Sequence, residues 1–229
     1  MTNKDLIKAN IEAVLEHIRS TGSNVKLIGV TKTVGAEEME AAVESGLSEF
    51  GESKVQEALP KIELLNSRHK NLKFHFIGHL QTNKVNKAVS YFSMIQSVDS
   101  EKLASKISAS AKASRKTVDA LLEVKVSAED TKFGIDPGKI KELAGKISGL
   151  DNIKIRGLMA MAPYFDNPED SRPYFKMARK LFDEVKKADI KNTEMQVLSM
   201  GMTDDYKVAI EEGSNMVRIG RKIFGERDY

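Results

Sequence analysis

The sequence predicts a parallel α/β fold, most economically a single (β/α)8 (TIM) barrel. Three observations lead to this fold class: short apolar runs alternate with longer segments of 3.6-residue periodicity, there are eight such runs, and no proline-rich or glycine-serine linker divides the 229 residues. Alternating strands and helices imply parallel strands with crossover helices, and eight units in one compact chain close into a barrel. An open doubly wound sheet is the alternative. We expect one domain over residues 1–229.

The elements follow one another in strand-helix order after an amphipathic helix at the start of the chain. In the first helix of the series, residues 36–46, Met39, Ala42 and Val43 share one face, and Gly46 is a candidate C-cap. Strands are expected at 25–32, 49–53, 72–78, 93–98, 118–126, 153–161, 194–200 and 215–220. Helices are expected at 36–46, 53–65, 81–89, 100–114, after Pro137, and at 169–188 and 204–212.

The composition is that of a folded soluble protein, with 41% hydrophobic and 30% charged residues. The net charge is only +3 and lysines stand beside acids, so we expect no nucleic-acid binding. The absence of cysteine excludes disulfides and suits a reducing compartment, hence a cytoplasmic location. The first 20 residues carry charges every few positions, which is typical neither of a signal peptide nor of a membrane span. We expect a monomer, because no long exposed apolar stripe is evident.

The loops after the seventh and eighth strands predict a phosphate site. In a (β/α)8 barrel the active site lies at the carboxyl ends of the strands, and these two loops often bind phosphate. Here they read LSMGMTDD (198–205) and VRIGRKIFG (217–225), with hydroxyls, small residues and positive charge. Ordinary turn and cap chemistry is the alternative, which the barrel rule disfavours. The residues that would form the cradle are Ser199, Thr203, Gly220, Arg221 and Lys222.

Lys32 follows an apolar run in LIGVTKTVG (27–35) and is either a solvated strand end or a reactive amine. Closure of the barrel brings the first strand beside the eighth, and so brings Lys32 beside the phosphate loops. Two interpretations of the amine are open: a catalytic amine acting on a phosphorylated substrate, or an amine that holds a phosphorylated aldehyde as a Schiff base. Pyridoxal 5'-phosphate (PLP) fits the second. By strand alternation Lys32 shares a face with Val30, and Arg218 shares one with Gly220, so an inward Arg218 could reach a ring nitrogen.

Seven motifs in order resemble the pyridoxal phosphate homeostasis proteins, also called the YggS or PROSC family. They are VTKT, FGESKVQE, FHFIGHLQTNK, KFG, IRGLMAM, LSMGMTDD and VRIGRKIFG, and the resemblance runs from about residue 8 to residue 225. It implies a single barrel similar to the N-terminal domain of alanine racemase. It also implies PLP binding, a role in the balance of vitamin B6 and amino-acid pools, and no established catalytic reaction.

The resemblance also assigns roles to residues. Lys32 would form the Schiff base, and Arg218 would face the pyridine nitrogen, where a permanent positive charge disfavours ring protonation. The phosphate would be held by Ser199, the backbone of Met200 and Gly201, Gly220 and Arg221. Ser53 and His75 complete the expected cofactor-binding residues.

Two differences from the family pattern, and a pair of histidines that could suggest a metal site, bear on these assignments. Ser53 stands where the family often has Asn, and Phe74 where it often has Trp. His75 and His79 flank the end of the third strand, but without an acidic ligand set we expect supporting roles and no metal.

Three functions are consistent with the sequence. The first is a PLP-binding homeostasis protein that is not an enzyme, with PLP-dependent apoenzymes as possible partners. The second is a PLP-dependent amino-acid racemase-like enzyme, which needs a second base; alanine racemases take a tyrosine from a C-terminal β-domain. The printed sequence ends at Tyr229, four residues after Gly225, so we expect no such domain. The third is a barrel enzyme that acts on a sugar phosphate without a cofactor.

Overall fold

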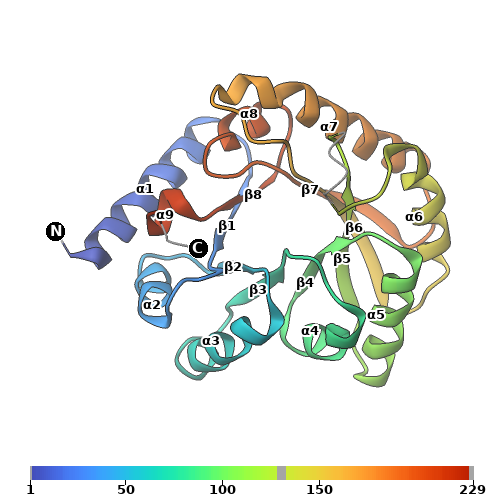
Figure 1. Cartoon of the computed structure of the whole chain (residues 1–229), viewed down its shortest axis with the longest axis horizontal. Helices are drawn as coiled ribbons and strands as arrows, with labels where there is room; N and C mark the ends of the chain where they lie inside the picture. Colours follow the sequence, from blue (N-terminus) through green and yellow to red (C-terminus); the bar gives the residue numbers. More distant parts are fainter. Residues whose placement is uncertain (1, 128–132, 227–229) are drawn as a thin grey trace.

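The structure is a closed barrel of eight parallel strands surrounded by helices, which confirms the predicted fold (Figure 1). It is a computed structural model and describes residues 2–127 and 133–226. Each strand pairs with its neighbours in chain order, and β8 pairs in parallel with β1 to close the sheet. The strands are β1 (Lys26–Val30), β2 (Glu49–Glu52), β3 (Lys73–Phe76), β4 (Met94–Val98), β5 (Val118–Val124), β6 (Ile153–Ala160), β7 (Thr193–Ser199) and β8 (Met216–Ile219).

The helices form a ring around the strands; α1 precedes β1, and each strand is followed by a helix (Figure 1). The α-helices are α1 (Asn3–Ser20), α2 (Ala36–Glu44), α3 (Val55–Arg68), α4 (Val85–Tyr91), α5 (Glu101–Ala113), α6 (Ile140–Ser148), α7 (Arg172–Lys187), α8 (Tyr206–Glu211) and α9 (Arg221–Phe224). Short 3-10 turns precede three of them: η1 (Thr82–Lys84), η2 (Pro137–Lys139) and η3 (Pro168–Ser171).

Most element boundaries differ from the predicted ones by one to three residues, and a few differences are of a distinct kind. Strand β1 ends at Val30, so Lys32 lies in the following loop rather than in the strand. Two helices begin as 3-10 turns with proline at the first position, because proline lacks the N–H that an inner helical position needs. The short helix α9 at Arg221–Phe224 is absent from the predicted elements. Lys132, the first residue of the KFG motif, lies outside the described residues.

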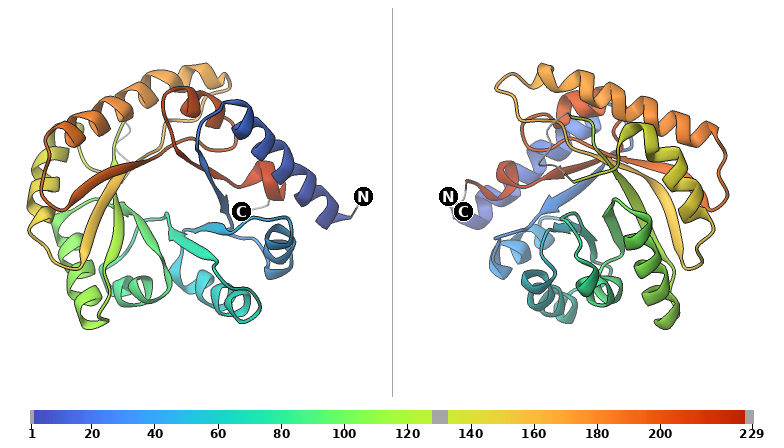
Figure 2. Two further views of the ribbon diagram at one scale, coloured as in Figure 1. Left: turned by 180° about the vertical axis from the view of Figure 1, so that it is seen from behind. Right: turned by 45° about the vertical axis from the view of Figure 1, so that its right-hand side comes forward.

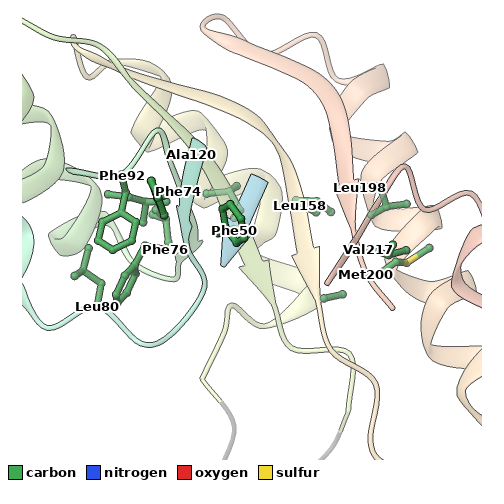
Figure 3. Packing of buried hydrophobic residues seen from close by; sticks show 14 of the residues in the cluster. Phe50, Phe74, Phe76, Leu80, Phe92, Ala120, Leu158, Leu198, Met200 and Val217 are labelled. Atoms are coloured by element: carbon green, nitrogen blue, oxygen red, sulfur yellow. The ribbon is translucent and has the colours of Figure 1, made fainter. Parts of the chain in front are cut away.

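Side chains alternate along the strands between two apolar regions. The larger region lies between the strands and the helices, and Figure 3 shows part of it, with Phe50, Phe74, Phe76 and Phe92 together. The rings of Phe50 and Phe74 stack with their centroids 5.7 Å apart. The smaller region fills the inside of the barrel and consists of Ile28, Met94, Leu121, Met159 and Met216.

The ends of the described chain come together on one side of the barrel. Helices α1 and α9 lie side by side in Figures 1 and 2. The Asn10 side chain on α1 donates a hydrogen bond to the carbonyl oxygen of Ile223 on α9, at 3.0 Å. The first helix is started by a capping box, in which Thr2 and Asp5 exchange hydrogen bonds. The first and last helices therefore brace each other next to the β8–β1 junction.

Candidate functional site

A cavity of about 330 Å³ lies at the carboxyl ends of the strands. This is the end of a (β/α)8 barrel at which loops collect functional side chains. Residues from the ends of β1, β2, β3, β6, β7 and β8 contribute to its wall. They are Val30, Lys32, Ser53, Ile77, Met161, Pro163, Tyr164, Phe165, Pro168, Ser171, Met202, Thr203, Asp204, Asp205, Arg218, Gly220 and Arg221.

Lys32 and Arg218 both line this cavity, as the alternation of side chains predicts. Along the first strand Ile28 belongs to the inner apolar region, and Val30 and Lys32 follow on the same face into the cavity. Along the eighth strand Met216 belongs to the same inner region, and Arg218 and Gly220 line the cavity. Closure between β1 and β8 therefore places an amine and a guanidinium on one wall.

An ion pair behind the strand ends holds the two loops that carry Lys32 and Ser53. Glu52 is 1% exposed, and its Oε1 accepts hydrogen bonds from Lys61 on α3 and from the Thr31 hydroxyl, the latter at 2.7 Å. The Lys61 ammonium also donates to the carbonyl oxygen of Thr31 at 2.8 Å. Glu52 Oε2 is buried with no hydrogen-bond partner among the described residues. We call Thr31, Glu52 and Lys61 the clamp.

Ser53 is held from a second direction by Gly78, at the end of β3. A Cβ atom at position 78 would lie 2.2 Å from the backbone oxygen of Ser53, much closer than any real contact. Only glycine allows the two loops to approach this closely. The backbone at Ser53 is thus fixed by the clamp on one side and by Gly78 on the other.

Arg218 is an almost fully buried cation, with 3% of its surface exposed. One guanidinium nitrogen, Nη1, donates to Ser199 Oγ at 2.6 Å, and Nη2 donates to the carbonyl oxygen of Ala160 at 3.0 Å. Burial lowers the pKa of Arg218 to about 10, and the nearby carboxylates of Asp205 and Glu123 oppose that shift. The guanidinium is therefore still positively charged at neutral pH.

The loops after β7 and β8 meet at the cavity. Arg221 forms an ion pair with Asp204, and the backbone N–H of Lys222 donates to the Thr203 hydroxyl at 3.4 Å. Asp205 accepts a hydrogen bond from the backbone N–H of Met202 at 2.6 Å, and burial raises the pKa of Asp205. The cavity wall here combines a hydroxyl, glycine backbone and both signs of charge.

Five of the nine residues that the sequence assigns to cofactor binding line the cavity: Lys32, Ser53, Arg218, Gly220 and Arg221. The other four do not. Ser199 is fully buried under Arg218, and Met200 packs in the outer apolar region. Gly201 has φ +93°, and a Cβ there would lie 2.6 Å from the Ala209 Cβ, so it packs the loop onto α8. His75 lies inside the barrel, where it contacts Gln96 and Glu49.

The sequence analysis missed the wall formed by the loop between β6 and α7. Met161, Pro163, Tyr164, Phe165 and Pro168 all line the cavity from this loop. The alternation rule offers one signal, because Met161 follows the inward-facing Met159 by two residues. The loop beyond Met161 has no pattern that predicts its position.

Two other kinds of feature are absent from residues 2–127 and 133–226. No group of three or more His, Asp or Glu side chains in these ranges is arranged to hold a metal ion. Within the same ranges, no helix has the length and apolar character needed to span a bilayer.

Comparisons with known proteins place the chain among characterised relatives. The family model for the alanine racemase N-terminal domain matches residues 2–228. The pyridoxal phosphate homeostasis protein of Aquifex aeolicus is 43% identical over 226 residues, covering 96% of this chain and 97% of the relative. That of Pasteurella multocida is 37% identical and covers 97% of this chain and 95% of the relative. The structure of PipY from Synechococcus elongatus with PLP bound superposes with a TM-score of 0.87 at 32% identity, covering 96% of this chain and 100% of PipY.

Proposed function

Because this chain belongs to the family of pyridoxal phosphate homeostasis proteins, we propose that its barrel cavity binds PLP and that the protein serves PLP (vitamin B6) and amino-acid homeostasis. The proposal includes a Schiff base between Lys32 and the cofactor aldehyde, and no catalytic reaction. The observation that carries it is that Lys32 and Arg218 line one cavity at the carboxyl end of the barrel. The PLP bound to PipY, a relative of the same length and fold, supports it.

The residues on the wall fit the chemical groups of PLP. An amine is the group that condenses with an aldehyde, and Lys32 supplies it. Arg218 would face the pyridine nitrogen. Its charge disfavours protonation of that nitrogen, so the ring would be a weaker electron sink than one paired with a carboxylate.

The phosphate would lie against the loops after β7 and β8. Thr203, Gly220 and Arg221 line the cavity there and offer a hydroxyl, a backbone N–H and a cation. In this proposal Met200 and Gly201 shape the loop from outside the cavity. Ser199 acts through its hydrogen bond with Arg218, because its hydroxyl is buried under the guanidinium. Ser53 contributes a hydroxyl from the end of β2, the strand next to β1.

The second candidate function is a PLP-dependent racemase-like enzyme. The observation that favours it is Tyr164, whose phenol lines the cavity with 71% of the residue exposed. A phenol in the cavity wall offers an acid–base group, although an exposed one is poorly held for proton transfer. We therefore place this function second.

Absorbance spectra before and after borohydride reduction test the Schiff base. We expect purified protein with PLP to show the absorbance of a protonated imine, and peptide mapping to find the reduced label on Lys32. The Lys32→Ala variant should lose the label, whereas Lys54→Ala, a change at an exposed lysine on the far side of the Ser53 backbone, should retain it. A label on another lysine would contradict the assignment.

An amino-acid racemisation assay separates the two candidate functions. Sustained racemisation of alanine or another amino acid by pure protein, abolished by Lys32→Ala, would overturn the non-enzymatic proposal. Colourless protein that gains no imine absorbance with PLP would favour a sugar-phosphate enzyme instead.

We also propose that the protein is a cytoplasmic monomer that exchanges PLP with PLP-dependent apoenzymes. Light scattering tests the monomer. Recovery of activity by an apoenzyme mixed with the PLP-loaded protein, compared with an equal amount of free PLP, tests the exchange.

A further inference from the structure

A line of five polar side chains crosses the inside of the barrel from the cavity to the opposite end. Arg218 on β8 contacts Ser199 on β7, Ser199 contacts Gln96 on β4, Gln96 contacts His75 on β3, and His75 contacts Glu49 on β2. The successive distances are 2.6 Å from Arg218 Nη1 to Ser199 Oγ, 2.7 Å from Ser199 Oγ to Gln96 Oε1, 3.0 Å from Gln96 Nε2 to His75 Nδ1, and 2.9 Å from His75 Nε2 to Glu49 Oε2. We call these five residues the inner chain.

Four of the five residues of the inner chain are buried, so the hydrogen bonds among them are made without competition from water, whereas Glu49 at its far end has 15% of its side chain exposed. Ser199 and Gln96 have no exposed surface, and Arg218 and His75 are 3% exposed. The second hydrogen of Gln96 Nε2 points to the sulfur of Met216, at 3.2 Å. Leaving a buried polar group without a hydrogen-bond partner lowers stability by about 1–3 kcal/mol. The loss of one hydrogen bond in the inner chain therefore affects the residue on each side of it.

The charges at the two ends of the inner chain, the Arg218 guanidinium that only donates and the Glu49 carboxylate that only accepts, together fix the direction of its bonds. A guanidinium only donates, so Ser199 Oγ accepts from it and turns its own hydrogen to Gln96. The Gln96 atom facing Ser199 is therefore the oxygen, and its NH2 group faces His75. His75 Nδ1 accepts that hydrogen, which leaves the ring hydrogen on Nε2 to be donated to the Glu49 carboxylate.

The far end of the inner chain is anchored by charges at the amino ends of the strands. Glu49 Oε1 lies 3.5 Å from the Lys26 ammonium and 4.0 Å from that of Lys73. The hydrogen bond from His75 lowers the pKa of Glu49 to about 2, so this carboxylate is charged and accepts firmly. With an anion at one end and a cation at the other, all hydrogen bonds of the inner chain point in the same direction, from Arg218 toward Gln96 and from Gln96 toward Glu49.

We propose that Gln96 is a positioning residue, which holds the Arg218 guanidinium toward the cavity through Ser199 while His75 and Glu49 fix the orientation of its amide. This inference rests on the proposed binding of PLP in that cavity. The hydrogen bonds of the Gln96 side chain go to Ser199, His75 and Met216, none of which lines the cavity, so its effect on the ligand passes through Ser199 and Arg218. A cation binds a ligand effectively only when neighbouring residues hold the cation in a fixed position.

A double-mutant cycle tests the proposal. The variants are Gln96→Leu, Ser199→Ala and the double change, with Gln196→Leu as control because Gln196 is exposed on β7. PLP titration should show that Ser199→Ala, which removes the charge-assisted hydrogen bond from Arg218, and Gln96→Leu, which removes the acceptor of the Ser199 hydroxyl, each weaken affinity about tenfold. Both changes act on one chain, so the double variant should be no worse than the weaker-binding single variant. Gln196→Leu should bind like the wild type.

The outcomes separate the inference from the function on which it rests. Wild-type protein that binds no PLP overturns both. Wild-type binding with unchanged affinity in Gln96→Leu, or with additive losses in the double variant, overturns only the positioning role. Urea unfolding of each variant shows whether it is folded, and Ser199→Ala, the smaller change, carries the test if Gln96→Leu does not fold.

A measurement without PLP tests the direction of the inner chain. Nitrogen NMR of the ligand-free protein distinguishes the two neutral forms of histidine. We expect His75 to carry its hydrogen on Nε2. A hydrogen on Nδ1 alone would overturn the proposal whatever the affinity for PLP.

Discussion

The ammonium of Lys61 and the carboxylate of Glu52 form a buried ion pair directly behind the cavity wall. The side chains are 13% and 1% exposed, and the Thr31 hydroxyl completes the clamp. Two clamp residues are each followed by a cavity residue: Lys32 follows Thr31, just after β1, and Ser53 follows Glu52, the last residue of β2. The Lys61–Glu52 ion pair therefore holds Thr31 and Glu52, the residues that directly precede Lys32 and Ser53 in the chain.

Replacing Lys61 by methionine should destabilise the protein by about 3 kcal/mol, because it leaves the Glu52 carboxylate buried without its cation. Urea unfolding monitored by circular dichroism measures the change. The matched control is Lys54→Met, whose pair with Glu57 is exposed at 69% and 45%, and we expect a loss of at most about 0.5 kcal/mol there. Equal effects of the two substitutions would contradict a structural role for the clamp.

Gly78→Ala should reduce the free energy of PLP binding by more than it reduces the free energy of unfolding. The added Cβ meets the backbone oxygen of Ser53, so the Ser53 loop must move out of the cavity wall. PLP titration and urea unfolding of the same variant measure both effects.

The control for Gly78→Ala is Gly145→Ala in helix α6, where a Cβ has no neighbour within 4 Å. Alanine is the better helix former, so this variant should gain about 0.5–1 kcal/mol and bind PLP normally. Normal PLP affinity in Gly78→Ala would show that the loop tolerates the shift.

Glu123→Gln should change the pH dependence of stability. Burial, with the nearby Asp99 charge, raises the pKa of Glu123 from 4.5 to about 7 in the folded protein. The folded state then binds the proton more tightly than the unfolded state, so the wild type loses stability as pH rises from 4.5 to about 7. The variant does not titrate, and its stability relative to the wild type should rise by up to about 3 kcal/mol over that window.

Urea midpoints at pH 4.5 and pH 8 measure the Glu123 effect. Glu142→Gln on α6 is the control, because a hydrogen bond from Lys146 lowers the pKa of this exposed carboxyl. Its difference from the wild type should have the opposite sign. A Glu123→Gln difference that is independent of pH would show that this carboxyl is not perturbed by burial.

Phe74→Trp should cost stability and leave PLP affinity unchanged. Phe74 is 2% exposed and stacks on Phe50 between the strands and the helices, on the face of β3 away from the cavity. A larger ring in a close-packed region costs about 1–3 kcal/mol. Unfolding and PLP titration of this variant would show whether the departure from Trp at this position is a matter of packing; a change in affinity would argue otherwise.

The fold could be predicted from the sequence because periodicity distinguishes strands from helices and their alternation fixes the topology. The placement of Lys32 and Arg218 on one wall follows from alternation plus closure, and the structure confirms it. The role of Ser199 could not be predicted in the same way, since a hydroxyl after a strand suits a phosphate and a buried arginine equally well. Its burial under Arg218 depends on Gln96, which is 103 positions away in the sequence.

The sequence contains only a weak signal of the inner chain. Gln96 and Ser97 interrupt the apolar fourth strand, and His75 interrupts the third, but the sequence at these positions does not show what each side chain faces. Which inward residues meet depends on the relative shift of neighbouring strands, including the irregular register between β4 and β5. Pairings between distant strands are set by that shift, which single-strand patterns do not contain.

The clamp bears on which insertions and deletions the chain can tolerate. Since neighbouring residues on a strand face opposite sides, removing one residue from β1 would turn Thr31 toward the cavity and drive the Lys32 amine into the layer beneath α3. The same deletion in β2 would expose Glu52 to the cavity and bury Ser53. An insertion or deletion in either strand would therefore both disrupt the cavity and move a charged side chain, Lys32 or Glu52, to the wrong side of the sheet. The loops that follow the helices are not subject to these two effects.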